Sequence, residues 1–116
     1  MKTAFEDMIV WQEAEMLTLK VYQEFQQNKD RWFKDQICRA SVSIMNNIAE
    51  WYERTWSKDK IRFYTIAKWS NAEVRSMLHI AYKLNYLQEV DYMILKQHTY
   101  GIAKMLYTLI QKVAKA

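Results

Sequence analysis

The chain has 116 residues and a formal net charge of +4, with no proline and one glycine, Gly101. This length fits one domain over residues 1–116 and allows a core without disulfide or metal support. Strands joined by tight turns need glycine and proline, so a composition rich in good helix formers predicts an all-α fold. The mild basic charge says little about the fold.

Features that report on the cellular compartment are few. The single cysteine, Cys38, cannot form an internal disulfide, which indicates a reducing compartment. No apolar run approaches the roughly 20 residues of a membrane span, and the N-terminal residues lack the apolar stretch of a secretion signal. We therefore expect a cytoplasmic protein that does not enter a membrane.

The first two helices are marked by apolar residues at helical spacing. The first is expected over about Phe5 to Gln26, and the polar run 26–30 ends it. Its apolar stripe consists of Val10, Ala14, Leu17, Val21 and Phe25. The second helix is expected over about Phe33 to Thr55. Its core stripe consists of Ile37, Ala40, Ser41, Ile44, Ile48 and Trp51.

The last two helices follow after short turns. Ser57 is the expected N-cap of the third helix, which reaches about Leu84, and Asn85 suits a left-handed C-cap. The fourth helix is expected over about Glu89 to Val113. In the third helix the expected buried residues are Phe63, Ile66, Ala67, Ser70, Val74, Met77, Leu78 and Ala81. In the fourth helix they are Ile94, Leu95, Ile102, Met105, Leu106, Leu109 and Val113. Short connections make neighbouring helices antiparallel, so the sequence predicts an antiparallel up-down-up-down four-helix bundle.

The second helix carries more apolar surface than one bundle core needs. Beside its core stripe lies a second apolar band, and a helix that is apolar over more than half of its circumference must be covered on two sides. This pattern favours a homo-oligomer, although a wide core stripe with scattered exposed residues would look similar. Small polar residues along the remaining strip also suit close packing between subunits. The candidate interface residues are Gln36, Cys38, Arg39, Val42, Ser43, Met45, Asn47, Ala49 and Glu50.

Four segments resemble a known family in order and spacing. Residues 36–50 read QICRASVSIMNNIAE and resemble Q-x-x-R-A-x-x-S-I-x-x-N-I-A-E, the signature of the 23S rRNA intervening-sequence protein family. Residues 7–14, DMIVWQEA, resemble its D-L-x-V-W-Q-x-A start. Residues 63–73, FYTIAKWSNAE, resemble its F-x-x-I-A-x-G-S-x-x-E segment, and residues 84–87, LNYL, resemble its L-G-Y-L turn.

The resemblance carries its own expectations. It implies a bacterial four-helix bundle that assembles into a pentamer with a basic surface and binds DNA or RNA or a reverse transcriptase. Its members are encoded in rRNA intervening sequences and elsewhere in bacterial genomes, and a relative is the accessory protein of diversity-generating retroelements. Trp51 and Trp69 stand where the family has glycine, and Met45 where it often has proline. The resemblance therefore does not predict identical subunit packing.

Basic and aromatic residues share one side of the third helix. Tyr64, Lys68, Asn71, Arg75, His79 and Tyr82 recur at spacings of three or four, and the segment from Tyr92 to Ala116 has four lysines and no acid. Cations interleaved with aromatic rings suit a phosphate backbone with its bases. The candidate nucleic-acid-binding residues are Tyr64, Lys68, Arg75, His79, Lys96, Lys104, Lys112 and Lys115. A plain solvated face is the alternative reading of these residues. The alternative function is a protein–protein interaction scaffold without nucleic-acid binding, in which the aromatic-rich outer face docks a partner.

Residue patterns for catalysis are missing. Neither His79 nor His98 follows a glutamate at the Glu-x-x-His spacing of bundle metal sites, and no cysteine cluster or glycine-rich phosphate loop is present. Glu50 and Glu53 read as part of a solvated face, Cys38 as a small hydrophobic residue, and His98 as a core or interface histidine. We expect no enzyme activity, cofactor or metal.

Overall fold

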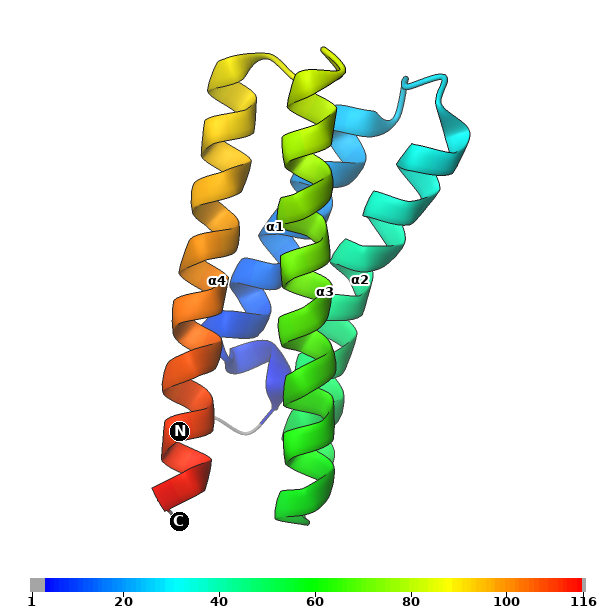
Figure 1. The fold of residues 1–116 in the computed structure, drawn as a ribbon. Coiled ribbons are helices and arrows are strands. Elements are labelled where there is room, and N and C mark those ends of the chain that lie inside the picture. The colour runs from blue at the N-terminus through cyan, green and yellow to red at the C-terminus, as the bar shows by residue number, and fades with distance from the viewer. Residues whose placement is uncertain (1–3, 116) are drawn as a thin grey trace.

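A computed structural model of the chain describes the backbone of residues 4–115 and the side chains of residues 4–112. It contains the antiparallel helices α1 (Ile9–Phe25), α2 (Arg31–Glu53), α3 (Ser57–Lys83) and α4 (Glu89–Lys115) (Figure 1). Each helix packs on the next, and α4 packs back on α1, in a bundle of 45 × 24 × 22 Å. The predicted all-α four-helix bundle is thus confirmed. The start of α1 and the end of α4 lie at the end that carries the α2–α3 turn.

The start of α1 differs from the prediction. Residues Phe5–Asp7 form a short 3₁₀ turn, η1, and Met8 is extended with φ −78° and ψ 129°, so the α-helix begins only at Ile9. The Phe5 ring packs edge-on against Trp11 with centroids 5.3 Å apart. The predicted start at Phe5 is wrong because Met8, which is buried, breaks the helical path.

The turn before α2 is tied to the turn before α4. Asp30 caps α2 by accepting a hydrogen bond from the Phe33 amide at 3.1 Å, and the Tyr86 hydroxyl donates to its other oxygen at 2.7 Å. These bonds, chiefly the one from Tyr86, lower the pKa of Asp30. One carboxylate therefore joins the two turns at this end of the bundle.

Of the two caps predicted for α3, the one at its start is wrong and the one at its end is confirmed. Trp56, which is extended, is the N-cap, and Ser57 is the first helical residue, so the predicted Ser57 cap is wrong by one position. At the other end Asn85 adopts φ 63°, as expected of a left-handed cap. Its amide donates to the Tyr82 carbonyl at 3.1 Å, and the Tyr86 amide donates to the Ala81 carbonyl at 2.8 Å. This pair of bonds is a Schellman motif and ends the helix.

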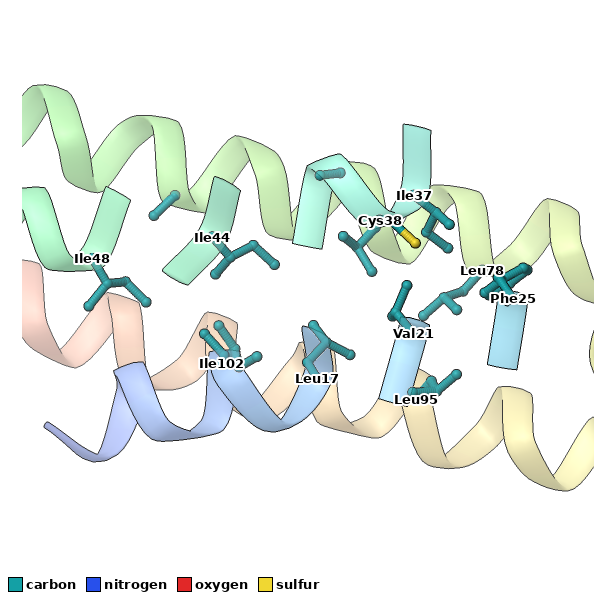
Figure 2. Close-up of a cluster of buried hydrophobic side chains, with 14 of the residues drawn as sticks. Leu17, Val21, Phe25, Ile37, Cys38, Ile44, Ile48, Leu78, Leu95 and Ile102 are labelled. Atoms are coloured by element: carbon teal, nitrogen blue, oxygen red, sulfur yellow. The ribbon is translucent and has the colours of Figure 1, made fainter. Parts of the chain in front are cut away.

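The core runs along the bundle axis (Figure 2). Every residue of the two stripes predicted for the first and second helices is buried, and so are Leu95, Ile102 and Leu106 of α4. Ile94, which was expected to be buried, is exposed because it lies about 100° around the helix from Leu95. The side chain of Val113 lies outside the described residues.

His98 lies where α4 packs on α1. Its side chain is buried, as expected, and its Nε2 atom is 3.3 Å from Oε1 of Glu13. Burial lowers the pKa of His98, and this effect outweighs the opposite effect of the Glu13 carboxylate. The neutral imidazole is therefore favoured in the folded protein.

Residues 4–112 contain neither a candidate membrane span nor a candidate metal site. No helix there is long and apolar enough to cross a bilayer. Within the same stretch, no three His, Cys, Asp or Glu side chains gather in a way that could hold a metal ion.

Candidate nucleic-acid interface

Cations and tyrosines alternate along the surface where α3 lies beside α4. We call this surface the α3–α4 face and define it by Tyr64, Lys68, Arg75, His79 and Tyr82 of α3 and by Tyr92, Lys96, Tyr100 and Tyr107 of α4. The five residues from α3 recur at helical spacing on one side of that helix. Contacts between the two helices bring the α4 residues next to them, so the face is built from both.

Two cations of the face rest on tyrosine rings. The Arg75 guanidinium carbon lies 4.9 Å from the centroid of the Tyr100 ring on the neighbouring helix. The Lys96 ammonium lies 5.5 Å from the Tyr92 centroid, one helical turn away on α4. Each contact is a cation–π interaction, which orients the cation without neutralising its charge. The face therefore keeps its positive charge.

A stack of two tyrosines anchors the end of the face near the α3–α4 turn. The rings of Tyr82 and Tyr92 are nearly parallel, with centroids 4.7 Å apart and an interplanar angle of 6°. The Tyr92 hydroxyl lies 3.4 Å from Nδ1 of His79, and the Lys83 ammonium lies 6.0 Å from the Tyr82 centroid. The stack holds this part of the two helices in register and leaves His79 exposed.

One nitrogen atom of the Arg75 guanidinium has no hydrogen-bond partner within the α3–α4 face. Its Nη1 atom is buried and has no hydrogen-bond partner among the described residues. A buried cationic donor is normally paired with a carboxylate or a carbonyl, because removing it from water without a partner costs free energy. Nη1 lies beneath the surface beside the Tyr100 ring, so only the remaining, exposed part of this half-buried side chain can meet an anion from outside the chain.

Acidic residues lie away from the face. Glu73 of α3 points to the opposite side, where it lines a hollow with Trp32 and Gln36 of α2. The acids of α4, Glu89 and Asp91, are both in its first turn. The segment from Tyr92 onward contains none, so little opposes the positive potential beside Lys68, Arg75 and Lys96.

The structure divides the predicted binding residues into two groups. Tyr64, Lys68, Arg75, His79 and Lys96 come together on the α3–α4 face. Lys104 lies one helical turn beyond Tyr100, but it and Lys112 line a hollow of about 420 Å³ between α4 and the start of α1, beside Met8 and Leu109. The side chain of Lys115 lies outside the described residues. The predicted set is therefore not one site.

Asn71 does not belong to the binding surface, although the spacing in the third helix predicted that it would. It is buried, and its Nδ2 atom donates to the Thr99 carbonyl of α4 at 2.9 Å. It lies on the same side of α3 as Arg75, one turn earlier, but directly beneath α4. Asn71 therefore joins the two helices and offers no surface to a ligand.

The polar strip of α2 makes its hydrogen bonds within the chain. Ser43 Oγ lies 2.8 Å from Ser70 Oγ of α3, and Asn47 donates to the Ser43 carbonyl at 2.8 Å. Gln36 and Arg39 are hydrogen-bonded to each other. The contact with Ser70 of α3 thus explains Ser43, and Asn47 is hydrogen-bonded within α2, so neither requires a second subunit.

The second apolar band of α2 is largely covered by the chain itself. Cys38 belongs to the core and is buried, so it has little exposure left to lose in an oligomer. Burial also raises the pKa of its thiol. Val42, Met45 and Ala49 are half-buried. The band is therefore a weaker reason for assembly than its sequence pattern indicated.

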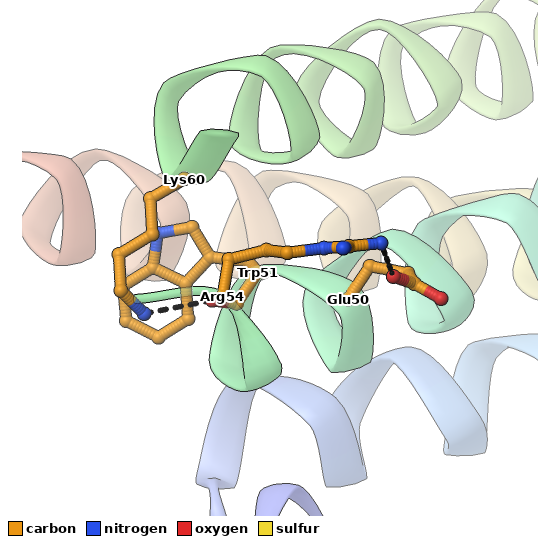
Figure 3. A network of polar contacts seen from close by, with 4 residues as sticks. All are labelled: Glu50, Trp51, Arg54 and Lys60. Atoms are coloured by element: carbon orange, nitrogen blue, oxygen red, sulfur yellow. Dashed lines mark hydrogen bonds and ion pairs between the residues drawn. The ribbon is translucent and has the colours of Figure 1, made fainter. Parts of the chain in front are cut away.

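The two tryptophans that replace family glycines lie in opposite environments. Trp51 is 9% exposed and Trp69 is 67% exposed. Figure 3 shows Trp51 against Lys60, whose ammonium is 4.1 Å from the ring centroid and donates to the Trp51 carbonyl at 2.7 Å. Beside it, Arg54 pairs with Glu50 at 2.6 Å. Trp51 thus joins the end of α2 to the start of α3.

Three residues of the face were missed by the sequence prediction, which considered only the cations of the last helix. They are Tyr92, Tyr100 and Tyr107. Their spacing in the sequence could have identified them, because Tyr92, Lys96 and Tyr100 follow one another at intervals of four residues and Tyr107 comes seven residues after Tyr100. This spacing places them on one side of a helix. The sequence alone could not show that this side of α4 contacts Arg75.

Comparisons with known proteins agree with the fold. A crystal structure of a protein of unknown function from the S23 ribosomal protein family of Bacteroides thetaiotaomicron is similar, with a TM-score of 0.82 and 22% identity. The match covers 88% of this chain and 98% of that one. A comparison with curated protein sequences gives no match. The family model for the 23S rRNA-intervening sequence protein matches residues 6–108, so the chain belongs to that family.

Proposed function

We propose that this protein is a non-catalytic nucleic-acid-binding protein that uses the α3–α4 face. The observation that carries the proposal is the half-buried Arg75, which rests on the Tyr100 ring without an ion-pair partner among the described residues, in a surface without opposing acids. A phosphate oxygen is an anionic acceptor that suits a guanidinium. Lys68, exposed on the same side of α3, adds a second phosphate contact about two helical turns away.

Charge reversal at these two positions is expected to weaken binding. Lys68→Glu combined with Arg75→Glu removes two phosphate contacts, so the slope of log affinity against log salt should fall in magnitude by about 1.5–2. Binding at low salt should weaken by about tenfold or more. Fluorescence anisotropy of a labelled oligonucleotide, titrated at several salt concentrations, measures both quantities.

A matched variant separates local contacts from net charge. Lys29→Glu with Arg31→Glu changes one lysine and one arginine, both exposed, in the α1–α2 turn and the first turn of α2. Both double variants lower the formal charge of +4 by the same amount. Equal weakening by the two would show that general charge, and not the face, drives binding. No binding by the unaltered protein at low salt would refute the proposal.

A second proposal concerns assembly, and exposed apolar residues favour it. Trp32 of α2 and Ile80 of α3 are exposed and line a hollow of about 360 Å³ together with Gln36, one of the interface candidates. Trp69 lies on the same side of α3 as Ile80, about three turns earlier. Exposed tryptophans are typical of contacts between proteins. We propose that this surface packs on another copy of the chain.

Substitution at this surface is expected to dissociate the assembly. Trp69→Glu with Ile80→Glu places two charges in the contact, so the mass from light scattering should fall towards the 14.1 kDa of one chain. The control is Trp56→Glu, because Trp56 is also exposed, at 75%, but lies in the α2–α3 turn. A pentamer is the subunit number that the family resemblance implies. A monomeric mass for the unaltered protein would refute the proposal.

A further inference from the structure

The α3–α4 face carries more aromatic surface than phosphate binding requires. Tyr100 is 47% exposed and Tyr107 is 62% exposed, although each lies next to a residue of α3. The Arg75 guanidinium is at 4.9 Å from the Tyr100 ring, and Tyr107 is close enough to Tyr64 to contribute to the raised pKa of that phenol, after the larger effect of burial. The Tyr100 ring supports Arg75 on one side, but contact to phosphates alone gives no role to the remaining exposed surface of the two rings.

These two rings form a row along α4. Residues seven apart lie on nearly the same side of a helix, about two turns or roughly 10.5 Å apart along its axis. The Arg75 cation next to Tyr100, and Lys68 on the same face, provide positive charge alongside the row. A row of rings beside a line of cations can hold bases and phosphates of one strand at once.

The form of the nucleic acid decides whether such rings can be used. In a duplex the bases stack on one another and present only their edges in the grooves. In a single strand they are free, and stacking on an aromatic side chain stabilises the complex whatever the sequence. We infer that the α3–α4 face selects single-stranded nucleic acid over duplex, with Tyr100 and Tyr107 stacking on bases. This inference rests on the proposed function and names its substrate class.

The test compares strand forms and ring substitutions. The probes are a labelled single-stranded DNA of roughly 16 nucleotides without self-complementarity, the RNA of the same sequence, and the duplex of that DNA. The variants are Tyr100→Ala with Tyr107→Ala, and Tyr100→Phe with Tyr107→Phe. We expect the single strands to bind more tightly than the duplex. The alanine pair should weaken single-strand binding about tenfold or more, whereas duplex binding should lose only the support that Tyr100 gives to Arg75, about threefold or less.

The phenylalanine pair distinguishes stacking from hydrogen bonding. It keeps both rings and removes both hydroxyls, so it should bind single strands like the unaltered protein. Weakening equal to that of the alanine pair would mean that the hydroxyls contact phosphates, and it would overturn the stacking inference. Because both side chains are exposed, circular dichroism should show an unchanged fold in every variant.

Failure of the inference can be told from failure of the proposed function. Equal affinity for single strand and duplex, with no effect of the alanine pair, would overturn the inference and leave nucleic-acid binding intact. Absence of binding to all three probes at low salt would overturn both. Similar binding of DNA and RNA would support a strand-form preference, and stronger RNA binding would add a contact to the 2′-hydroxyl.

Discussion

Replacement of Trp51 by alanine is expected to lower the free energy of unfolding by about 3–5 kcal/mol. The ring is nearly enclosed between the end of α2 and the start of α3, and its removal leaves a cavity that rigid neighbours cannot fill. The change also removes the aromatic partner of the Lys60 ammonium. Urea unfolding followed by far-ultraviolet circular dichroism measures the loss without relying on tryptophan fluorescence.

Trp56→Ala is the matched control for this prediction. Both tryptophans lie where α2 turns into α3, but Trp56 is 75% exposed and its side chain makes no cap hydrogen bond, so its loss should change the free energy of unfolding by about 0.5 kcal/mol or less. Lys60→Met should reproduce part of the Trp51 effect, a loss of about 0.5–2 kcal/mol, because it removes the cation–π contact and the hydrogen bond to the Trp51 carbonyl. Similar losses at Trp51 and Trp56 would contradict the burial that separates them.

The helical core could be predicted because burial repeats with the period of the helix. Val10, Ala14 and Leu17 are spaced so that no other secondary structure would bury all three, and each is buried in α1. Asn85 was predictable for a similar reason, since asparagine tolerates the left-handed conformation that a helix end requires.

The ends of two helices could not be predicted in the same way. Met8 has good helix propensity, yet it is extended and contributes its side chain to the core. Trp56, with no side-chain oxygen to cap a helix, occupies the position expected for Ser57. In both cases tertiary packing outweighs local preference, which a single sequence does not reveal.

The candidate site was only half predictable. Helical spacing placed Lys68, Arg75 and His79 on one side of the third helix, and they do share the α3–α4 face. Spacing cannot show how far the next helix covers that side, so it does not reveal that Asn71 is buried beneath α4. It also cannot show that Lys104 lines the hollow beside Met8 whereas Lys96 rests on the Tyr92 ring.

Replacement of Leu17 by alanine is expected to lower the free energy of unfolding by about 3–5 kcal/mol, because Leu17 is 0% exposed at the centre of the core (Figure 2). This loss is a large fraction of the stability of a typical small domain. Chemical denaturation at constant protein concentration measures it, with the dependence on denaturant concentration showing whether the transition stays two-state.

Leu19→Ala provides the control for this prediction on the same helix. Leu19 lies two residues further along α1 and is 57% exposed, so its replacement should cost about 0.5 kcal/mol or less. The two substitutions remove the same atoms and have the same effect on helix propensity, so their difference isolates burial in the bundle. Equal losses would contradict the orientation of α1, because rotating the helix enough to bury Leu19 would expose Leu17 and, with it, the stripe from Val10 to Phe25.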